Sequence, residues 1–507
     1  MTQSQKSWTG RAAEPWHDEP VSPVVKQNKA RLQQVFGSPA DLFFREVDAP
    51  GGPMVITAYL DGLIDGSRLD RDVLQTLVLE SGGPAGTPEL PAPGGTALST
   101  LGEVAQQILD GALVLFQEGL TVARAFQIQA YPTRAVTEPE GETSVRGPKE
   151  GFIEDLRTNL SLLRRIVRTP NLRLEPMTLG TVTHTKVVLV YLQGLAREQT
   201  IAEARSRLQR IDVDSVLDTS TLEELIEDNP WSPFPQLLDT QRPDVVAGHI
   251  LEGRFAILAS GSPTALVAPI GFGVFLQTSE DYYERYWIAS LVRLLRFFFA
   301  SLSLLLPSLY VAVMTYHQEL VPTALAMTIA RAREGIPFPA LIEILLMETS
   351  FEALREAGLR LPKAIGQAVS IVGALVIGEA AVRAGIVSAP VVIVVSTTGI
   401  ASFTMPRFSG AITLRILRFP LLIAAGSLGL YGVTIGLIFL MIHVASLSSF
   451  GMPYLSPWSA WSPQGLLDVF LRAPRWQQRR RPQTARRDAT ARVEYGLGPT
   501  GRNGSDM

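Results

Sequence analysis

The sequence predicts an α/β region of two related small subdomains, expected to be cytoplasmic, followed by an α-helical transmembrane domain of about four spans. Two observations lead to this fold class. From Phe297 to Tyr316 the chain runs for twenty residues without a charge, which is the length that a helix needs to cross a bilayer. Before this run, two pairs of short segments recur in the same order.

Three further apolar segments bring the expected number of spans to four: Ile365 to Val382, Ile386 to Met405 and Phe419 to Val444. Leu341 to Phe351 is also apolar but is too short to cross alone, which favours an interfacial or re-entrant helix over a fifth span. The overall composition, with 46% hydrophobic residues, 18% charged residues and a mean hydropathy of +0.19, fits a chain that is partly soluble and partly embedded.

The distribution of charge predicts the orientation in the membrane. No apolar signal segment precedes the soluble region, so we expect that region to stay in the cytoplasm. Arg293 and Arg296 before the first span, and an arginine-dense C-terminal tail, place both ends on the same side, which requires an even number of spans. Arg407, Arg415 and Arg418 disagree, because four spans would put them outside. The tail could also attract nucleic acid or anionic lipid, but anchoring explains it.

The recurring segments predict a duplicated α/β unit. Val55 to Leu63 resembles Val187 to Leu195, and Ile108 to Gly119 parallels Ile250 to Gly261. In each case a strand-like run ends in a glycine turn, or a helix-like run enters a strand through a glycine. Chance similarity between short strand–turn pieces is the alternative interpretation.

These patterns divide the chain into five parts. We expect a disordered N-terminus (1–22), a first α/β subdomain (23–145) that opens with a helix at Val24 to Phe36, a charged linker helix with a second α/β subdomain (146–290), a transmembrane domain (291–450), and an interfacial segment with a basic cytoplasmic tail (451–507). In the linker helix, Leu156, Leu160, Leu163 and Val167 form an apolar stripe.

The segment from Tyr131 to Pro170 carries the densest mixture of charges, including a Gly147-Pro148 break. This segment could form an ion-pair network between protomers or bind an anionic ligand. Alternatively, its charges could simply be solvated on the surface of a helix, since exposed ion pairs are weak and common. The candidate residues for oligomer or signal contacts are Arg134, Glu138, Glu142, Arg146, Arg157 and Arg164.

The sequence contains no pattern of an enzyme. It has no cysteine, which excludes disulfides and thiolate metal sites, and no phosphate loop, nucleophile elbow or zinc-protease motif. The dinucleotide-like GLGPTG at Gly496 to Gly501 has no strand before it and no helix after it, so we reject it. We expect no catalytic residue, no cofactor and no metal site.

One predicted span carries polar and small residues at helical spacing. A stripe of this kind can line an ion path, or it can simply allow tight helix packing. Glu379 lies near the end of the stripe, where a carboxylate is costly unless it meets water or a partner, and Arg383 is its partner at i+4. The candidate pore-lining residues are Lys363, Gln367, Ser370, Ala374, Gly378 and Glu379.

Several stretches resemble the A subunits of the GerA-type spore germinant receptors, over nearly the whole chain from about Asn28 to Pro482. The departures are Gln241, where many relatives carry an acidic residue, and the Gly/Pro-rich loop at Ser81 to Gly95. The stretches that carry the resemblance are AYLDGLID, ILDGALVLFQEG, TEPEGETSVRGPKEGFIEDLRTNLSLLRRI, TQRPD, SEDYYERY, FEALREAGLRLPKAIGQAVSIVGALVIGEAAV and FGMPYLSPWS.

The resemblance implies a multi-pass subunit of a nutrient-gated receptor in the spore inner membrane. It implies a permease-like B subunit that senses nutrients and a lipoprotein C subunit as partners, and a homo-oligomeric ring that releases ions and triggers germination. Three alternatives remain at this point: an accessory A-subunit-like protein of the dipicolinate-release locus, a membrane scaffold without a pore, and a secondary transporter. The transporter is disfavoured because the spans are few and lack an inverted repeat.

Overall fold

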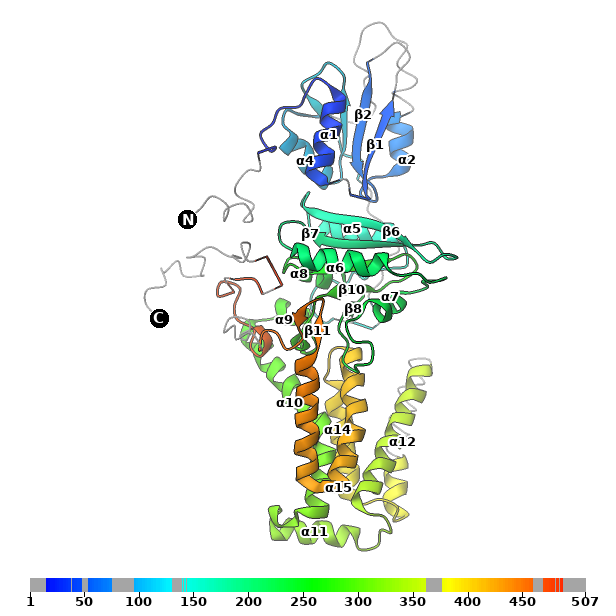
Figure 1. Ribbon diagram of the computed structural model, residues 1–507, viewed down its shortest axis with the longest axis vertical. Helices are drawn as coiled ribbons and strands as arrows, with labels where there is room; N and C mark the ends of the chain where they lie inside the picture. The colour runs from blue at the N-terminus through cyan, green and yellow to red at the C-terminus, as the bar shows by residue number, and fades with distance from the viewer. Residues whose placement is uncertain are drawn as a thin grey trace, which may run out of the picture.

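The computed structural model describes residues 15–37, 39–47, 53–74, 95–129, 139, 141–142, 144–361, 376–458, 468–478, 480–482 and 484–486. Two α/β units follow one another along the long axis of the molecule, and a helical bundle extends from the second (Figure 1). We call them unit 1, which contains β1 to β5, and unit 2, which contains β6 to β10. Most of the expected disordered N-terminus and of the Ser81 to Gly95 loop falls outside the described residues.

Unit 1 is an antiparallel sheet with the strand order β1-β2-β4-β5-β3. Two helices, α1 (Val25–Phe36) and α4 (Leu101–Leu109), pack on one face, where Leu32, Phe36 and Ile108 are buried. Thr100 and Glu103 form a capping box that fixes the start of α4. The remaining elements are β1 (Leu42–Val47), β2 (Val55–Leu60), α2 (Gly66–Arg68), the π-helical turn η2 (Leu69–Leu74), β3 (Thr96–Leu98), β4 (Leu113–Gln117) and β5 (Ala123–Phe126).

Unit 2 repeats this plan with the strand order β6-β7-β9-β10-β8. Its sheet is covered on both faces: α5 (Leu156–Ile166) and α8 (Pro243–Ile250) pack on one side, and α6 (Glu198–Gln209) and α7 (Thr219–Ile226) pack on the other. The strands are β6 (Leu172–Leu179), β7 (Thr185–Leu192), β8 (Leu238–Thr240), β9 (Phe255–Ala259) and β10 (Ala265–Ala268).

The shared strand order matches the duplication that the sequence predicts, because the repeated segments occupy equivalent strands. Gly62 after β2 and Gly194 after β7 have φ of 81° and 79°, and Gly111 and Gly253 have φ of 84° and 86°. Only glycine adopts such angles without strain, so the repeated glycines mark the same turns in both units. The apolar stripe of α5 is buried in unit 2, as predicted.

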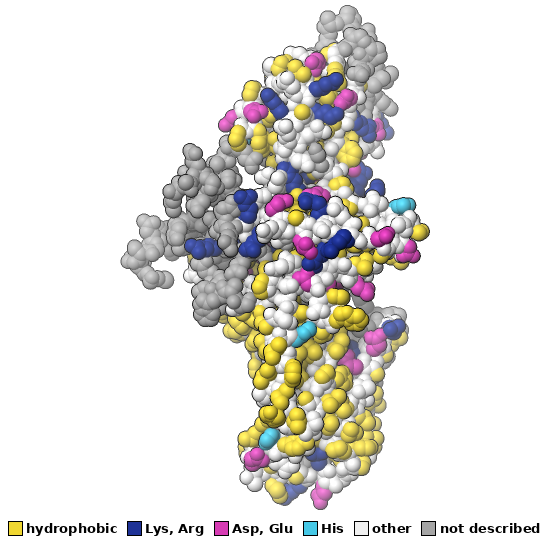
Figure 2. Space-filling view, viewed as in Figure 1, with side chains coloured by type: hydrophobic (Ala, Val, Ile, Leu, Met, Phe, Trp, Pro, Cys, Tyr) yellow, Lys and Arg dark blue, Asp and Glu magenta, His cyan; other side chains and the backbone are white. Residues whose placement is uncertain are grey.

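The bundle consists mainly of α10 (Tyr286–Tyr316), α12 (Ala340–Arg360), α14 (Ala389–Phe403) and α15 (Phe408–Ser446). In Figure 1, α11 (Thr323–Arg333) lies across the end that is far from unit 2. Hydrophobic side chains cover the bundle, whereas charged side chains gather on the two units (Figure 2). Short connecting elements are η4 (Phe272–Leu276), α9 (Glu280–Tyr283), η5 (Gln318–Leu320), β11 (Ser448–Ser449) and β12 (Met452–Pro453).

Among the described residues, two helices, α10 and α15, are long and apolar enough to cross a membrane, which is fewer than the four spans expected. The third expected span is the shorter apolar helix α14, and Ile365 to Val382 lies largely outside the described residues. The segment from Leu341 to Phe351 is not an isolated short helix, since it belongs to the 21-residue α12.

The expectation that Phe419 to Val444 forms one continuous span is wrong, because α15 folds back on itself at Gly429. This residue has φ 63° and ψ −143°, which breaks the helix into two arms. The arms run side by side, since a Cβ atom added at Gly436 would lie 2.5 Å from the Leu421 side chain. The Tyr316 hydroxyl, at the end of α10, donates to the carbonyl oxygens of Gly426 and Ser427 and closes the tip.

The hairpin also explains the position of Arg407, which four single spans would have put on the opposite side. Both arms end at unit 2: Ser409 bonds to Asp239 near the start of α15, and His443 bonds to Ser232 near its end. Arg407 therefore lies on the side of unit 2 and not at the opposite end of the bundle. Counting Phe419 to Val444 as one pass had reversed the expected side of this residue.

Candidate functional site at the junction of unit 2 and the bundle

The starts of α10 and α15, the helix α8 of unit 2 and residues 468–478 of the tail meet where unit 2 joins the bundle. Asp281 of α9 is almost fully buried and accepts from Arg293 Nε at 2.8 Å and from Arg296 Nη1 at 2.9 Å. Arg293 also pairs with Asp468 of the tail at 3.3 Å, and burial raises the pKa of Asp468. These contacts fix the beginning of α10 to the tail.

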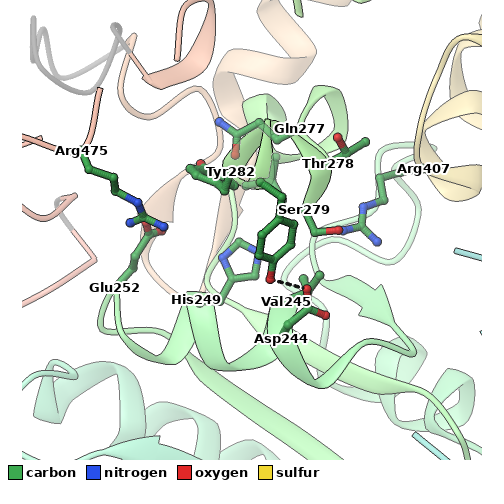
Figure 3. A pocket seen from close by; sticks show the side chains of 13 residues that line it. Asp244, Val245, His249, Glu252, Gln277, Thr278, Ser279, Tyr282, Arg407 and Arg475 are labelled. Atoms are coloured by element: carbon green, nitrogen blue, oxygen red, sulfur yellow. Dashed lines mark hydrogen bonds between the residues drawn. The ribbon is translucent and has the colours of Figure 1, made fainter. Parts of the chain in front are cut away.

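A second set of pairs joins unit 2 to both long helices. Arg242, next to α8, bonds to Asp244 with distances of 2.9 and 3.1 Å. The Tyr283 hydroxyl donates to the same carboxylate at 2.8 Å, the bond that is dashed in Figure 3, and burial together with this bond raises the pKa of Tyr283. Arg407, before α15, lies 2.7 Å from Glu142. The junction is therefore held by charge-assisted hydrogen bonds, which are stronger than neutral ones.

A small cavity of about 130 Å³ lies at the junction, lined by Asp244, Tyr283 and Arg407 among others (Figure 3). Two of its lining nitrogens, His249 Nδ1 and Arg407 Nε, are buried without a hydrogen-bond partner among the described residues. Burial, reinforced by Arg254 and Arg407, lowers the pKa of His249 well below its usual range, so this imidazole is neutral. A cavity of this size has room for ordered waters, and the two unpartnered nitrogens could bond to them. Its lining residues are Asp244, Val245, Gly248, His249, Glu252, Val274, Gln277, Thr278, Ser279, Tyr282, Tyr283, Arg407 and Arg475.

A line of ion pairs continues from the junction into the bundle. Glu343, Glu348 and Glu352 follow one another along α12, and we call them the α12 charge ladder. Glu348 and its partner Arg418 have exposures of 0% and 1%. Burying charges costs free energy unless they are paired, so such residues in apolar helices are functional candidates by default.

Each carboxylate of the ladder binds a different part of the bundle. Glu352 pairs with Arg415 of α15 at 2.8 Å. Arg418 of the same helix binds Glu348 and also donates to Ser303 of α10 at 3.0 Å. Glu343 pairs with Arg333 of α11 at 3.0 Å and accepts from the backbone of Ser388, before α14, at 2.9 Å. The ladder thus connects α12 to four other helices.

The sequence-predicted pore residues are only partly visible. Lys363, Gln367, Ser370 and Ala374 lie outside the described residues. Gly378 is buried, and its nearest neighbour is Val392 of α14. Glu379 forms the expected i,i+4 pair with Arg383 at 2.5 Å, with both side chains more than half exposed.

The predicted oligomer or signal contacts that the structure describes all form ion pairs within the chain. Arg134 and Glu138 lie outside the described residues, and Glu142 holds Arg407. Arg164 contradicts the expected role, because it is 1% exposed and paired with Asp41 of unit 1, and so it is not accessible to another copy. The contacts of the two remaining candidates are also within the chain: Arg157 with Asp61, and Arg146 with Glu284 at 3.4 Å. These two guanidinium groups keep more than half of their surface exposed.

Sequence reasoning missed the α12 charge ladder. The signal was present, since Glu343 and Glu348 interrupt the apolar run at Leu341 to Phe351, and Glu348 and Glu352 have the i,i+4 spacing that puts both on one face of a helix. No group of three or more metal-ligating side chains occurs within the part of the chain that the structure describes.

Comparison with known proteins decides the family. The family model described as Bacillus/Clostridium GerA spore germination protein matches residues 30–484. The chain belongs to the GerA family. It is 42% identical to spore germination protein KA of Bacillus subtilis, over 93% of this chain and 88% of that protein. It is 40% identical to spore germination protein GerLA of Bacillus cereus, over 91% and 96%. The uncharacterized membrane protein YfkQ of B. subtilis is 46% identical, over 92% of each chain.

Among solved structures, this GerA-family chain is similar to the N-terminal domain of the A subunit of the Bacillus megaterium spore germinant receptor GerK3. The match covers 50% of this chain and 98% of that chain, with 29% sequence identity and a TM-score of 0.40. The family is named for spore germination and not for an enzymatic activity.

Proposed function

We propose that the chain is the A subunit of a nutrient-gated germinant receptor, and that several copies assemble in the spore inner membrane around an ion-release path. Membership of the GerA family supports the receptor role. A permease-like B subunit would sense the nutrient and a lipoprotein C subunit would complete the complex. Units 1 and 2 would lie in the cytoplasm, because the bundle begins and ends at unit 2 and because arginines concentrate on that side.

The observation that carries this proposal is a set of contacts from unit 2 to α12, the helix that precedes the segment with the pore candidates in the sequence. Arg407 binds Glu142 at the junction, and farther along α15 Arg415 and Arg418 bind the α12 charge ladder. α12 leads directly into residues 362–382. A displacement of unit 2 would therefore move the start of α15, then α12, and then the pore-lining stripe. Coupling through a packed network with two arrangements is a known form of gating.

The test replaces a small residue of the stripe. Spores in which Ala374→Leu replaces the native residue should contain normal amounts of the protein but should not release cations on exposure to nutrient. Val376, which is 55% exposed and lies on another face, provides the matched control in Val376→Leu. Normal release from Ala374→Leu spores would contradict the pore. A strictly monomeric full-length protein, by light scattering in detergent, would leave a scaffold as the better description.

A further inference from the structure

The loop between α7 and β8 presents a large aromatic side chain to the outside. Trp231 is 94% exposed, although tryptophan is usually well buried. The loop itself is rigid: Asn229 and Gln236 exchange two hydrogen bonds of 2.9 and 2.7 Å across its base. Three prolines, at 230, 233 and 235, further restrict its backbone. Trp231 is thus held outward by the fold.

The position of the loop along the bundle axis follows from its contacts with α15. Ser232 bonds to His443 at 2.9 Å, and the Thr413 hydroxyl donates to the Pro233 carbonyl at 2.5 Å, so the loop contacts both arms of α15 close to their unit 2 ends. The uncharged part of the first arm starts at Phe419, six residues beyond Thr413, or about 9 Å at the helical rise. The headgroup layer of a bilayer is about 5–7 Å deep on each side. The Thr413 contact therefore lies at least about 2 Å beyond the water-facing edge of that layer, which puts the loop directly above the headgroups.

Other aromatic side chains pack beside the loop but inside the fold, where Phe234 and Tyr454 are buried, so Trp231 is the exposed ring of this loop. Phe234 packs against His443, Phe272 and Tyr454, with ring centroids 5.9 to 6.4 Å apart. Farther round the bundle, Trp458 packs on Phe272. Aromatic residues concentrate at membrane–water interfaces, because an apolar ring with a polar edge fits the headgroup region.

We infer that Trp231 inserts into the headgroup layer, so that unit 2 rests directly on the lipid surface through the loop of residues 229–236. The inference rests on the membrane orientation in the proposed function. Lipid is the occupant that the position selects, because the loop is continuous with the apolar outer surface of α15, where Ile416 and Ile423 are more than half exposed. A bilayer supplies both an apolar contact for the indole ring and acceptors for its N–H group.

The test uses a spin label at a single cysteine. The chain contains no cysteine, so Trp231→Cys in the full-length protein provides one labelling site. The labelled protein is placed in nanodiscs of phosphatidylethanolamine and phosphatidylglycerol, and its collisions with oxygen, which prefers lipid, and with a water-soluble nickel complex are measured. Val182→Cys, at a 75% exposed position in the β6–β7 turn, reports water, and Ile423→Cys, at a 57% exposed position on α15, reports lipid.

A label at position 231 should give oxygen and nickel accessibilities between those of the two controls. If the label at position 231 is as accessible to nickel as the label at position 182, while position 423 lies in lipid, the inference is overturned and the proposed function stays intact. Loss of both accessibilities with spin–spin broadening would mean that a second copy covers Trp231, which also overturns it. Nickel accessibility at position 423 would contradict the membrane orientation, and both proposals would fail.

Discussion

Arg164 of α5 and Asp41 of unit 1 form a buried ion pair with two hydrogen bonds, from Nε to Oδ2 at 2.7 Å and from Nη2 to Oδ1 at 3.0 Å. Their side chains are 1% and 6% exposed. Arg157, on the same helix, pairs with Asp61. The helix that belongs to unit 2 therefore also holds unit 1, and the Arg164–Asp41 pair is the buried one among the ion pairs that join the two units.

Replacing Asp41 by Ala should lower the free energy of unfolding by about 3 to 5 kcal/mol, because Arg164 would remain buried without its counter-charge. Thermal unfolding of the purified full-length chain, followed by circular dichroism, measures this loss. Glu284→Ala is the matched control, since it breaks the exposed pair with Arg146 and should cost at most about 1 kcal/mol. Equal effects of the two variants would show that the buried pair does not hold the units.

Two sets of changes in the α12 charge ladder should distinguish its effect on folding stability from its effect on cation release. Glu348→Ala leaves Arg418 buried and unpaired, and should destabilise the bundle by about 3 to 5 kcal/mol. The double variant Glu348→Leu with Arg418→Met replaces the pair by apolar groups, which is often neutral for stability. We expect this double variant to fold and to reach the membrane but to release cations poorly. Wild-type release from spores with the double variant would show that the pair is only structural.

Glu223 of α7 should make the stability of unit 2 depend on pH. Burial, with smaller contributions from Asp239, Glu227 and Asp218, raises the pKa of Glu223 from 4.5 to about 8. Between these values the folded chain binds a proton that the unfolded chain does not, so the free energy of unfolding falls as pH rises from 4.5 to about 8.

The variant Glu223→Gln should flatten that part of the pH–stability curve and should raise the melting temperature above pH 8. Glu224→Gln, at the exposed neighbouring position, should leave the curve as in the wild type. Melting curves across the interval compare the three proteins. A Glu223→Gln curve that coincides with the wild-type curve would exclude a protonated carboxyl at this position.

Gly429→Ala should destabilise the hairpin of α15, because φ 63° with ψ −143° is a conformation that essentially only glycine adopts. The expected cost is about 1–3 kcal/mol, measured as a lower melting temperature in detergent. Gly248→Ala in α8 is the control: this position has a helical backbone and open space around it, so alanine should be neutral or slightly stabilising. An unchanged melting temperature for Gly429→Ala would mean that the two arms form one continuous helix.

Local patterns in the sequence predicted the units well. The repeated strand–glycine segments indicated β2 and β7 at equivalent places in two similar sheets, and the leucines of α5 indicated its buried face. Both features depend on side-chain period and backbone sterics, which are properties of neighbouring residues. The same reasoning failed for α15, because hydropathy measures how apolar a segment is and does not detect a reversal of direction at one glycine.

The ion pairs that join the parts of the molecule could not be predicted for a different reason. Arg164 and Asp41 are 123 residues apart, and Arg407 and Glu142 are farther apart still. Each of these residues has a charge that suits an exposed position as well as a buried one. Only the three-dimensional structure shows which arginine side chains are buried. Our assignment of Arg164 to a surface between protomers was wrong because charge density along the chain does not indicate burial.

The hairpin at Gly429 has a mechanical consequence. Both of its ends attach to one short stretch of unit 2, between Ser232 and Asp239, while its tip is held by Tyr316 at the opposite end of the bundle. The first arm of 21 residues is about 30 Å long. The hairpin therefore has a single base and a fixed tip, and we expect a small rotation of unit 2 to move the far end of the bundle without any change of structure along the two arms.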